Sequence, residues 1–479
     1  MKLLTVILII LAWPASLGAA DWPQWGHDNS RNMVGNEKNL PDSFDPGKAK
    51  DGGDEIDLTT TKNVKWVAKL GSQTYGNPTV GGGRVFVGTN NDSPRNKART
   101  GDFGVLMCFD EATGKFLWQL LVPKLAAGKN SDWEFVGLCC SPTIHGDRVY
   151  IVTNRCEVLC LTTKGTAAGD ADVIWRYDMR DELGVFPHNM TSSSVLVVGD
   201  RLYVTTSNGV DWTNKHIPNP TAPALICLDK KTGQLIGQER SGICSRMFKS
   251  NWSSPTYGKV GGREMVIFGG GDGFCYGFAP VPVDGGLQEL WRCDCNPADR
   301  RWLNGKPIKY GSEKGPCEII ATPVLKDGRV YVTIGQDPES GEGSGALVCI
   351  DPSQSGDITK TGTCWTYPAI NRSISTVSVE NGLVFVADFS GIIHCIDAAD
   401  GKPLWTQDTE AKVWGSTLVS DGKVFLGNES GVFTIMAADR VKKVLGSVSF
   451  DGPVYSSAVT ANGVLYVTTD KYLYALRKQ

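Results

Sequence analysis

The sequence has few histidines, no excess of either charge, and no long hydrophobic run after its first residues. Its five histidines show no spacing typical of a metal site; they are His27, His145, His188, His216 and His394. With 48 Lys and Arg against 51 Asp and Glu, the net charge of −3 argues against nucleic acid or an anionic membrane as the main partner. No later stretch approaches the roughly 20 apolar residues of a transmembrane helix. A Gly-x-Ser-x-Gly motif of serine hydrolases is also missing.

The first twenty residues have the pattern of a secretory signal peptide. One Lys precedes an apolar run from Leu3 to Trp13, and small residues stand at Gly18 and Ala20. We predict a signal peptide over residues 1–20, cleaved before Asp21, and no lipid anchor, because no Cys follows the cleavage site. The protein is therefore expected to be exported, to the periplasm, the cell envelope or the extracellular space.

Glycine is abundant, with 56 residues, and a hairpin-like unit recurs along the chain. Each copy has two short β-rich runs joined by a Gly-containing turn. The eight copies begin at Asn77, Ser141, Ser193, Ser254, Thr322, Ser375, Ser416 and Ser457. Most continue into a third apolar run and a turn that leads to Trp, as in LMCFDEATGKFLW and HCIDAADGKPLW. Each unit therefore predicts a four-stranded antiparallel meander, the blade of a β-propeller.

The last copy ends without its Trp strand, and an isolated Trp strand precedes the first copy. This isolated strand is NVKWVAKLG, from Asn63 to Gly71. Pairing it with the chain's last strands would complete the eighth blade and remove two open sheet edges. We predict an all-β fold, a single eight-bladed propeller over residues 63–479, closed by an N-terminal strand that completes the C-terminal blade. Residues 21–62 are expected to form an extended N-terminal segment.

The repeated Asp/Thr/Gly…Trp motifs resemble the tryptophan-docking repeats of the pyrroloquinoline quinone (PQQ)-like propeller family. The resemblance covers nearly all of the mature chain, and it implies the fold more strongly than a function. The family includes the quinoprotein alcohol dehydrogenases and the non-enzymatic scaffold lipoprotein of the β-barrel assembly machine. The stretch DWPQWGHDNSRN at Asp21 resembles the mature start of secreted PQQ-like repeat proteins, and no chemistry can be attached to it.

Long loops are expected on one face of the ring. The connections between the first and second strands are short, whereas the opposite face receives the long loops 89–104, 122–137, 207–224 and 295–318. The residues before each first strand should surround the channel mouth on that face. They are Tyr75, Leu138, Cys139, Asn189, Met190, Asn251, Trp252, Ile319, Ile320, Arg372, Trp414 and Tyr455. Such a ring could be a ligand site or could simply fill the channel.

Six of the fourteen cysteines recur at one repeat position, in the third strand. We predict that these six, Cys108, Cys160, Cys227, Cys275, Cys349 and Cys395, are buried thiols. A bridge from Cys293 or Cys295 to Cys317 would close the longest loop. Cys139 and Cys140 are adjacent, so a disulfide between them would form a strained ring. Alternatively, Cys140 merely replaces the Ser that other copies carry there.

The resemblance to quinoprotein dehydrogenases implies a vicinal disulfide against the quinone ring, a calcium ion and an Asp base. The implied cofactor-binding residues are Cys139, Cys140, Asn251, Trp252, Arg372, Trp414, Tyr75 and Tyr455. The nearest oxygen-bearing candidates for calcium are Asn189, Asn251, Glu134 and Asp211. Asp211 is the candidate base, with the alternative that it is a turn residue beside Trp212.

Two functions remain as hypotheses. The first is a non-catalytic binding or scaffold protein that holds a protein or peptide through the long-loop face, with a small-molecule ligand possible in the channel mouth. The alternative is a PQQ- and calcium-dependent alcohol or sugar dehydrogenase that uses a Cys139–Cys140 disulfide.

Overall fold

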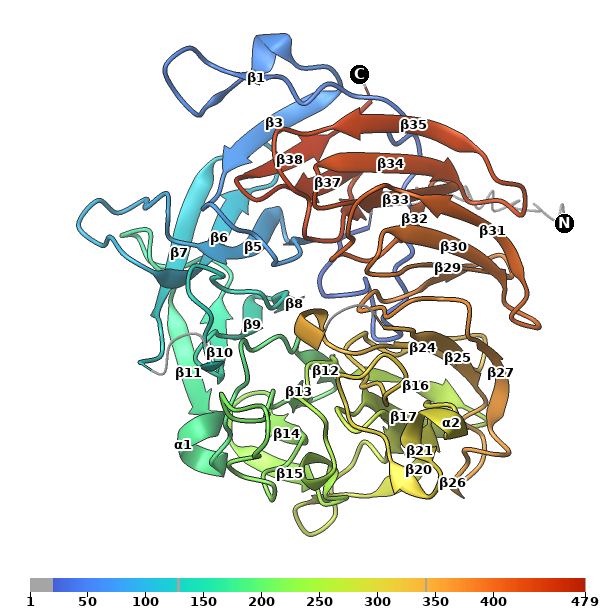
Figure 1. The fold of residues 1–479 in the computed structure, drawn as a ribbon. Coiled ribbons are helices and arrows are strands. Elements are labelled where there is room, and N and C mark those ends of the chain that lie inside the picture. Colours follow the sequence, from blue (N-terminus) through green and yellow to red (C-terminus); the bar gives the residue numbers. More distant parts are fainter. Residues whose placement is uncertain (1–19, 127–129, 341–342, 479) are drawn as a thin grey trace, which may run out of the picture.

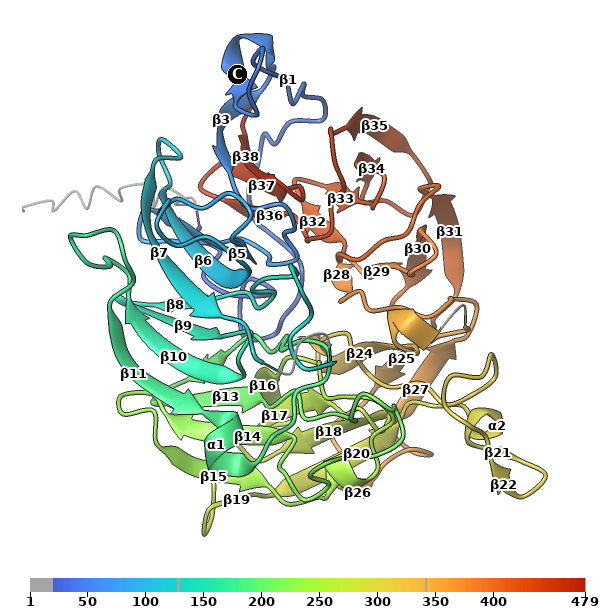
Figure 2. The same cartoon turned by 60° about the vertical axis from the view of Figure 1, so that its left-hand side comes forward.

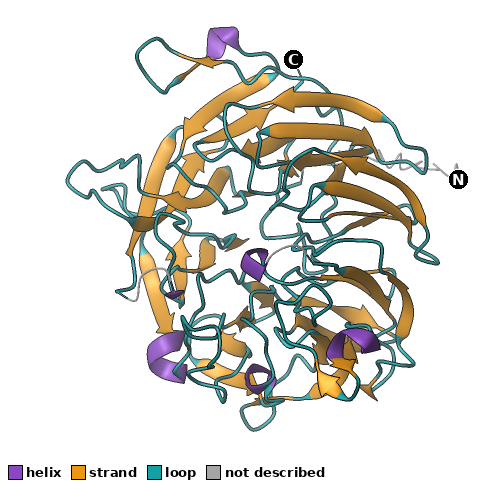
Figure 3. Ribbon diagram, in the orientation of Figure 1, coloured by secondary structure: helices purple, strands orange, loops and turns teal. Residues whose placement is uncertain are grey.

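The chain forms a ring of eight antiparallel blades of four strands each, as predicted (Figures 1 and 3). The structure is a computed structural model, and it describes residues 20–126, 130–340 and 343–478. The predicted signal peptide lies outside these residues, apart from Ala20. Among the described residues, no helix is both long and apolar enough to cross a membrane.

Each blade runs outward from a short inner strand beside the channel. The strands of blades one to four are β4 (Thr79–Gly81), β5 (Arg84–Asn90), β6 (Phe103–Asp110) and β7 (Phe116–Pro123); β8 (Thr143–His145), β9 (Arg148–Val152), β10 (Glu157–Thr162) and β11 (Val173–Asp178); β12 (Leu196–Val198), β13 (Arg201–Thr205), β14 (Leu225–Asp229) and β15 (Leu235–Glu239); β16 (Thr256–Val260), β17 (Arg263–Gly269), β18 (Phe274–Phe278) and β20 (Glu289–Asp294). Those of blades five to seven are β23 (Val324–Lys326), β24 (Arg329–Ile334), β25 (Ala346–Ile350) and β27 (Thr363–Tyr367); β28 (Ser378–Glu380), β29 (Leu383–Ala387), β30 (Ile392–Asp397) and β31 (Pro403–Asp408); β32 (Leu418–Ser420), β33 (Lys423–Gly427), β34 (Val432–Ala437) and β35 (Val444–Ser449).

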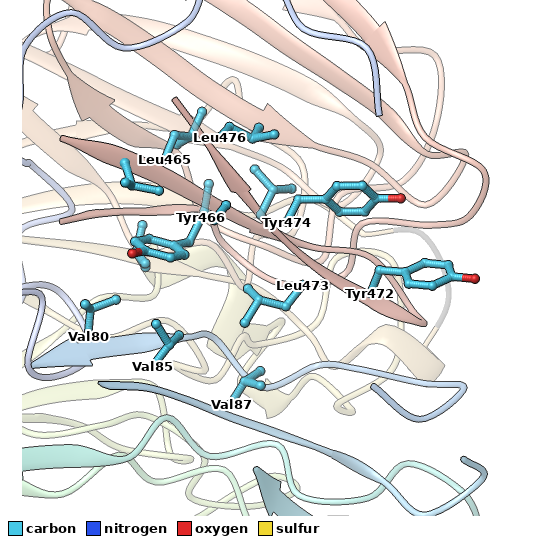
Figure 4. Close-up of a cluster of buried hydrophobic side chains, with 14 of the residues drawn as sticks. Val80, Val85, Val87, Leu465, Tyr466, Tyr472, Leu473, Tyr474 and Leu476 are labelled. Atoms are coloured by element: carbon cyan, nitrogen blue, oxygen red, sulfur yellow. The ribbon is translucent and has the colours of Figure 1, made fainter. Parts of the chain in front are cut away.

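The eighth blade is built from both ends of the propeller, as predicted. Its strands are β36 (Val459–Ala461), β37 (Val464–Thr468), β38 (Tyr472–Leu476) and β3 (Val64–Lys69). β3 pairs antiparallel with β38, so that Trp66 lies opposite Ala475 and Val67 opposite Tyr474. The apolar side chains of blades eight and one then pack together; Figure 4 shows Val80, Val85 and Val87 opposite Leu465, Tyr466 and Leu473. The ring therefore has no open sheet edge between its first and last blades.

The Asp-x-x-Thr-Gly turn receives the tryptophan of the preceding blade. In the turn after β6, Asp110 accepts hydrogen bonds from the backbone and hydroxyl of Thr113. Gly114 has a φ of 73°, and a Cβ at this position would lie 2.6 Å from the ring of Trp66. Trp66 Nε1 also donates to Glu111 O at 3.0 Å. Position 114 therefore requires glycine for two reasons: its positive φ and the close approach of the Trp66 indole.

The six repeated cysteines are buried, as predicted. Each lies in the third strand of its blade, with at most 1% of its surface exposed. The position suits a small apolar side chain, because the fourth-strand tryptophan or its equivalent packs beside it.

Residues at or next to the first position of each repeat form a belt of hydrogen bonds around the channel, here called the inner belt. Its members are Asn77, Ser141, Ser194, Ser254, Thr322, Thr376, Ser416 and Ser457. The bonds run from Asn77 Nδ2 to Ser141 Oγ (3.1 Å), Ser141 N to Ser194 Oγ (3.2 Å), Ser194 N to Ser254 Oγ (2.9 Å), Thr322 N to Thr376 Oγ1 (3.1 Å), Thr376 N to Ser416 Oγ (2.9 Å), Ser416 N to Ser457 Oγ (2.7 Å) and Ser457 N to Asn77 Oδ1 (2.6 Å). The asparagine at the point of closure donates through its amide nitrogen and accepts through its amide oxygen.

Residues 20–37, here called the N-terminal strap, pass along the inner strand of every blade in order. Figure 1 shows this segment in dark blue inside the ring. Its contacts with blades one to eight are Trp22 N to Val80 O, Ile144 N to Pro23 O, Asn29 Nδ2 to Val197 O, Tyr257 N to Asn29 O, Leu325 N to Ser30 O, Asn32 Nδ2 to Val379 O, Val419 N to Met33 O and Gly463 N to Glu37 Oε2. Gly82 N donates to Asp21 of the strap, and Gly463 N donates to Glu37. Both glycines belong to turns between first and second strands, so the strap lies at the short-turn end of the channel.

Arg31 holds the strap in place from the centre of the ring. Its side chain has no exposed surface. The guanidinium donates to the carbonyls of Pro255 at 2.9 Å, Trp25 at 2.6 Å and Val195 at 3.1 Å. Burial lowers the pKa of Arg31 to about 9, so it is a cation at neutral pH. One side chain thus joins the strap to blades three and four.

The remaining elements decorate the ring. The strap is followed by a small hairpin of β1 (Lys48–Ala49) and β2 (Ile56–Asp57) and the 3₁₀ turn η1 (Leu58–Thr60). The long loop after blade four carries α2 (Ala298–Arg301) and a hairpin of β21 (Trp302–Leu303) and β22 (Lys306–Pro307), which projects from the ring in Figure 2. The other short elements are α1 (Met179–Leu183), η3 (Ile243–Ser245), η4 (Pro338–Ser340), β19 (Gly286–Leu287) and β26 (Gly356–Asp357).

Candidate functional site

A cavity of about 530 Å³ lies on the propeller axis between the inner belt and the long loops. Its floor consists of the eight inner-belt residues together with Trp25 of the N-terminal strap. The Trp25 indole donates to Thr322 Oγ1 at 3.0 Å, at the junction of blades four and five. Long-loop residues, among them Trp133, Glu134 and Glu339, line the other end. The strap therefore closes the channel from below, and the cavity faces the long-loop side.

Most of the predicted mouth residues do line this cavity. They are Tyr75, Cys139, Asn189, Met190, Trp252, Ile320, Trp414 and Tyr455, and Glu134 joins them. The four others, Leu138, Asn251, Ile319 and Arg372, are buried behind the lining, as is Cys140. The Asn251 side chain points away from the cavity because both ends of its amide have partners elsewhere. The amide oxygen accepts from Gly271 N at 2.9 Å, and the amide nitrogen lies 3.3 Å from the Cys244 sulfur. Arg372 instead packs over the Phe389 ring, 4.5 Å from its centre.

An aromatic cluster forms one wall of the cavity. Tyr75 and Tyr455 stack with ring centres 4.7 Å apart, and Trp414 meets Tyr75 edge-on at 5.9 Å. Phe389 lies behind Trp414 at 4.8 Å. Burial, followed by the neighbouring Tyr455, Cys139 and Glu429, raises the pKa of Tyr75, so its phenol is neutral at physiological pH. The wall can therefore offer stacking surface and a hydroxyl, but no phenolate.

Trp252 forms part of the facing wall. Its indole N–H donates to Met190 O at 3.1 Å, and its own carbonyl accepts from Ser192 Oγ at 3.0 Å. The indole N–H groups of Trp252 and Trp414 are thus both used internally, since Trp414 Nε1 donates to Glu429 Oε2 at 3.0 Å. The rings are held rigidly, and they present apolar surface to whatever enters.

Acidic side chains at the mouth are neutralised from within the protein. Lys249, which is 5% exposed, lies 3.4 Å from Asp337 Oδ1 and 3.4 Å from Glu339 Oε2. Glu339 also accepts from Asn189 Nδ2 at 3.1 Å, and Asp337 is 2.8 Å from the Tyr310 hydroxyl. Although burial alone would raise it, the pKa of Asp337 lies below its ordinary value, because Lys249, Ser340 and Tyr310 favour the carboxylate.

Glu318 lies behind this group and carries the opposite shift. It is fully buried, and its Oε1 is 2.7 Å from the Tyr310 hydroxyl. Burial and the nearby Asp337 charge raise the pKa of Glu318 well above its ordinary value. The buried part of this cluster therefore combines a carboxyl group whose pKa is lowered, Asp337, with one whose pKa is raised, Glu318.

The structure does not support the predicted vicinal disulfide. Cys139 and Cys140 are both free thiols, as are all fourteen cysteines of the chain. The Cys140 side chain turns toward Thr191 and donates to its carbonyl at 3.2 Å, whereas Cys139 faces the cavity. Burial raises the pKa of Cys139 to about 12. The predicted bridges from Cys293 or Cys295 to Cys317 are likewise not formed, and Cys317 Sγ instead lies 3.1 Å from Arg300.

Asp211 does not belong to the cavity. It caps its own turn, accepting from Thr213 N at 3.0 Å and Thr213 Oγ1 at 2.5 Å. These bonds lower the pKa of Asp211. The turn interpretation therefore holds, and the role as base does not fit the position of this residue.

A calcium ion does not fit the donor set of the site. Of the predicted oxygen-bearing residues, Asn189 donates its amide nitrogen to Glu339, and the Asn251 oxygen accepts from Gly271 N. The carboxylates of Asp337 and Glu339 already face Lys249. In the described part of the chain, no three His, Cys, Asp or Glu side chains are arranged to hold a metal ion. A cation that requires about six to eight oxygen ligands would have to displace these partners.

Several lining residues were missed from the sequence. Trp25 comes from a stretch without repeat character, and Asp337, Glu339 and Trp133 come from long loops whose path no repeat specifies. The inner belt did leave a signal, since a small polar residue stands at or next to the first position of every repeat copy.

Comparison with known proteins gives two kinds of relative. A family model described as outer membrane protein assembly factor BamB matches residues 63–242 and 359–444, more than half of the chain. A 1-butanol dehydrogenase (cytochrome c) of Thauera butanivorans is 32% identical over 129 residues, which cover 24% of this chain and 17% of that protein. The assembly factor BamB of Nitrosomonas eutropha is 29% identical over 98 residues, 20% of this chain and 24% of that one. The chain thus spans about a quarter or less of the length of these two curated relatives.

A solved structure extends the likeness over nearly the whole propeller. BamB from Moraxella catarrhalis superimposes with a TM-score of 0.55 at 15% identity, covering 87% of this chain and 97% of that one. At such identity the likeness concerns the fold.

Proposed function

Because the chain belongs to the family of the outer membrane protein assembly factor BamB, we propose that it is a non-catalytic binding propeller of the cell envelope. It holds a protein or peptide partner on its long-loop face and takes an apolar or aromatic group of that partner into the axial cavity. The observation that carries this proposal is the closure of the channel by the N-terminal strap, which leaves an aromatic cavity facing one side.

The chemistry of the lining supports binding rather than turnover. The indole N–H groups of Trp25, Trp252 and Trp414, like the carboxylates near Lys249, already have partners within the protein, and belt hydroxyls accept hydrogen bonds from neighbouring blades. Cys139 is a thiol and Tyr75 a phenol at neutral pH, so neither is an activated nucleophile or base. What remains free is rigid stacking surface with a rim of fixed polar groups, the composition typical of a recognition site.

Cross-linking from the mouth tests the proposal. Phe135, which is 48% exposed beside the lining residues Glu134 and Val136, is replaced by the photo-reactive p-benzoylphenylalanine in cells that make the protein. Irradiation should join it to one envelope protein. The same substitution at Asp147, an exposed residue of a short turn in blade two, is the control and should give no such adduct. Equal adducts from both positions would contradict a partner on the long-loop face.

The PQQ-dependent dehydrogenase remains a second candidate, since Cys139 lines the cavity and one relative is a 1-butanol dehydrogenase. The purified protein is incubated with PQQ and calcium, freed of excess cofactor, and assayed for its absorption spectrum and for dye-linked oxidation of alcohols. We expect neither retained cofactor nor turnover, because the Asp337 and Glu339 carboxylates beside the cavity already face Lys249. Retained PQQ together with alcohol oxidation that disappears in Cys139→Ser would establish the dehydrogenase and overturn the binding proposal.

A further inference from the structure

The outer strands of the blades share a bulge, and blade five fills it differently from the others. In blades one to seven, the fourth strand has one extra residue opposite the third strand. The extra residues in six of these blades are aliphatic: Leu117, Ile174, Ile236, Leu290, Leu404 and Leu445. In blade five it is Cys364, because Cys349 lies opposite Trp365 and Ile350 opposite Thr363.

This bulge brings two thiols together. Two residues of a bulged strand share the position opposite one residue of the partner strand, so Cys364 joins Trp365 beside Cys349. Burial raises the pKa of Cys349, and the neighbouring Cys364 thiol raises it further, in keeping with the strand register that places the two residues side by side. Cys349 is buried and Cys364 is exposed. A buried repeat cysteine thus has a second cysteine within reach, and that second sulfur is open to solvent.

A cation also lies at the exposed sulfur. Arg329 Nη1 is 2.9 Å from Cys364 Sγ and 2.8 Å from Asp351 Oδ2. An arginine next to an accessible cysteine is an environment typical of reactive thiols. Cys364 is therefore suited to react first with an oxidant, with Cys349 as the second thiol.

The chain between the two cysteines clasps the neighbouring blade. β26 (Gly356–Asp357) pairs in parallel with β20 of blade four, and Ile358 is buried against that blade. Arg263 of blade four donates to the carbonyls of Pro352 at 2.7 Å and Gln354 at 2.6 Å. Cys349 and Cys364 stand at the two ends of this clasp, so a bond between them would close it into a loop.

We propose that Cys349 and Cys364 form a disulfide in the oxidised protein, a staple at the base of the clasp between blades four and five. The oxidant is a disulfide bond in another molecule of the cell envelope, such as the active-site disulfide of a thiol oxidoreductase. The Cys364 thiolate attacks that disulfide and releases one thiol. The Cys349 thiolate then attacks the Cys364 sulfur and releases the second thiol. Two protons leave the cysteines, and the oxidant takes up the two electrons.

Peptide mapping tests the staple directly. The purified protein is equilibrated with oxidised glutathione, its remaining thiols are alkylated without reduction, and the peptides are identified by mass spectrometry. We expect a linked peptide pair containing Cys349 and Cys364, with the other repeat cysteines alkylated. Alkylated Cys364 in the folded, oxidised protein, or its linkage to any cysteine other than Cys349, would overturn the proposal.

Melting temperatures give a second readout. Oxidised wild type should melt on the order of 3 °C higher than the reduced protein, because the bond closes the clasp. Cys364→Leu restores the residue of the other blades and should fold, yet melt at one temperature under both conditions. Cys139→Ser is the matched control and should keep the wild-type difference. A redox-dependent shift of the same size in Cys364→Leu would contradict the assignment.

Discussion

Replacing Arg31 with methionine is expected to lower the free energy of unfolding by about 3–5 kcal/mol, the range for breaking a buried charged network. The side chain is fully buried and donates to carbonyls of Trp25, Val195 and Pro255. Methionine fills much of the volume but donates nothing, so these carbonyls would be left without the bonds they make now. Urea denaturation followed by tryptophan fluorescence measures the change.

The control variant changes Lys38, the residue that directly follows the N-terminal strap. Lys38 is exposed, and Lys38→Ala should change the unfolding free energy by no more than about 0.5 kcal/mol. If Arg31→Met and Lys38→Ala were equally stable, the strap would not be held by the buried guanidinium, and the sealed floor would lose its main support.

Lys249→Met should be destabilising by about 3–5 kcal/mol at pH 7, and the loss should shrink as the pH falls toward 4 and below. In wild type the pKa of Asp337 is below the ordinary value of 3.8, so Asp337 contributes stability above that pH and loses it as the pH falls through the folded value. In the Lys249→Met protein, burial is no longer opposed by the ammonium, so the pKa of Asp337 should rise above its ordinary value. Protonation of Asp337 at low pH then removes the unpaired buried charge and restores part of the lost stability.

Denaturation of both proteins at several pH values measures this difference. Lys412→Met is a suitable control, since Lys412 also lines the cavity but lies over the Phe389 ring, 5.7 Å from its centre, rather than between carboxylates. A loss of stability in Lys249→Met that is independent of pH would show that packing, and not charge, explains the effect.

The repeats made the ring and its closure predictable. Of the eight units, seven are complete and one is split between the two ends of the repeat region. Pairing β3 with β38 completes the split unit. The mouth ring followed from the same periodicity, because the residue before each inner strand must approach the axis. Most of those residues line the cavity.

The floor could not be predicted in this way. The strap turns through positive φ at His27 and Arg31, and it binds each blade through a different combination of backbone and side-chain groups. The strap contacts therefore do not recur at a regular sequence spacing, and no repeat pattern could predict them. The same holds for Asp337 and Lys249, which meet only because two long loops fold over the mouth.

The most direct measurement is the yield of the cross-linked partner from position 135 when the cavity wall is altered. In a Trp414→Ala background that remains folded by circular dichroism, we expect the yield at limiting partner concentration to fall about tenfold or more, as for a central aromatic anchor. Val441→Ala, at an exposed turn of blade seven, should leave it unchanged. An unchanged yield in the Trp414→Ala protein would contradict the cavity as the site of binding.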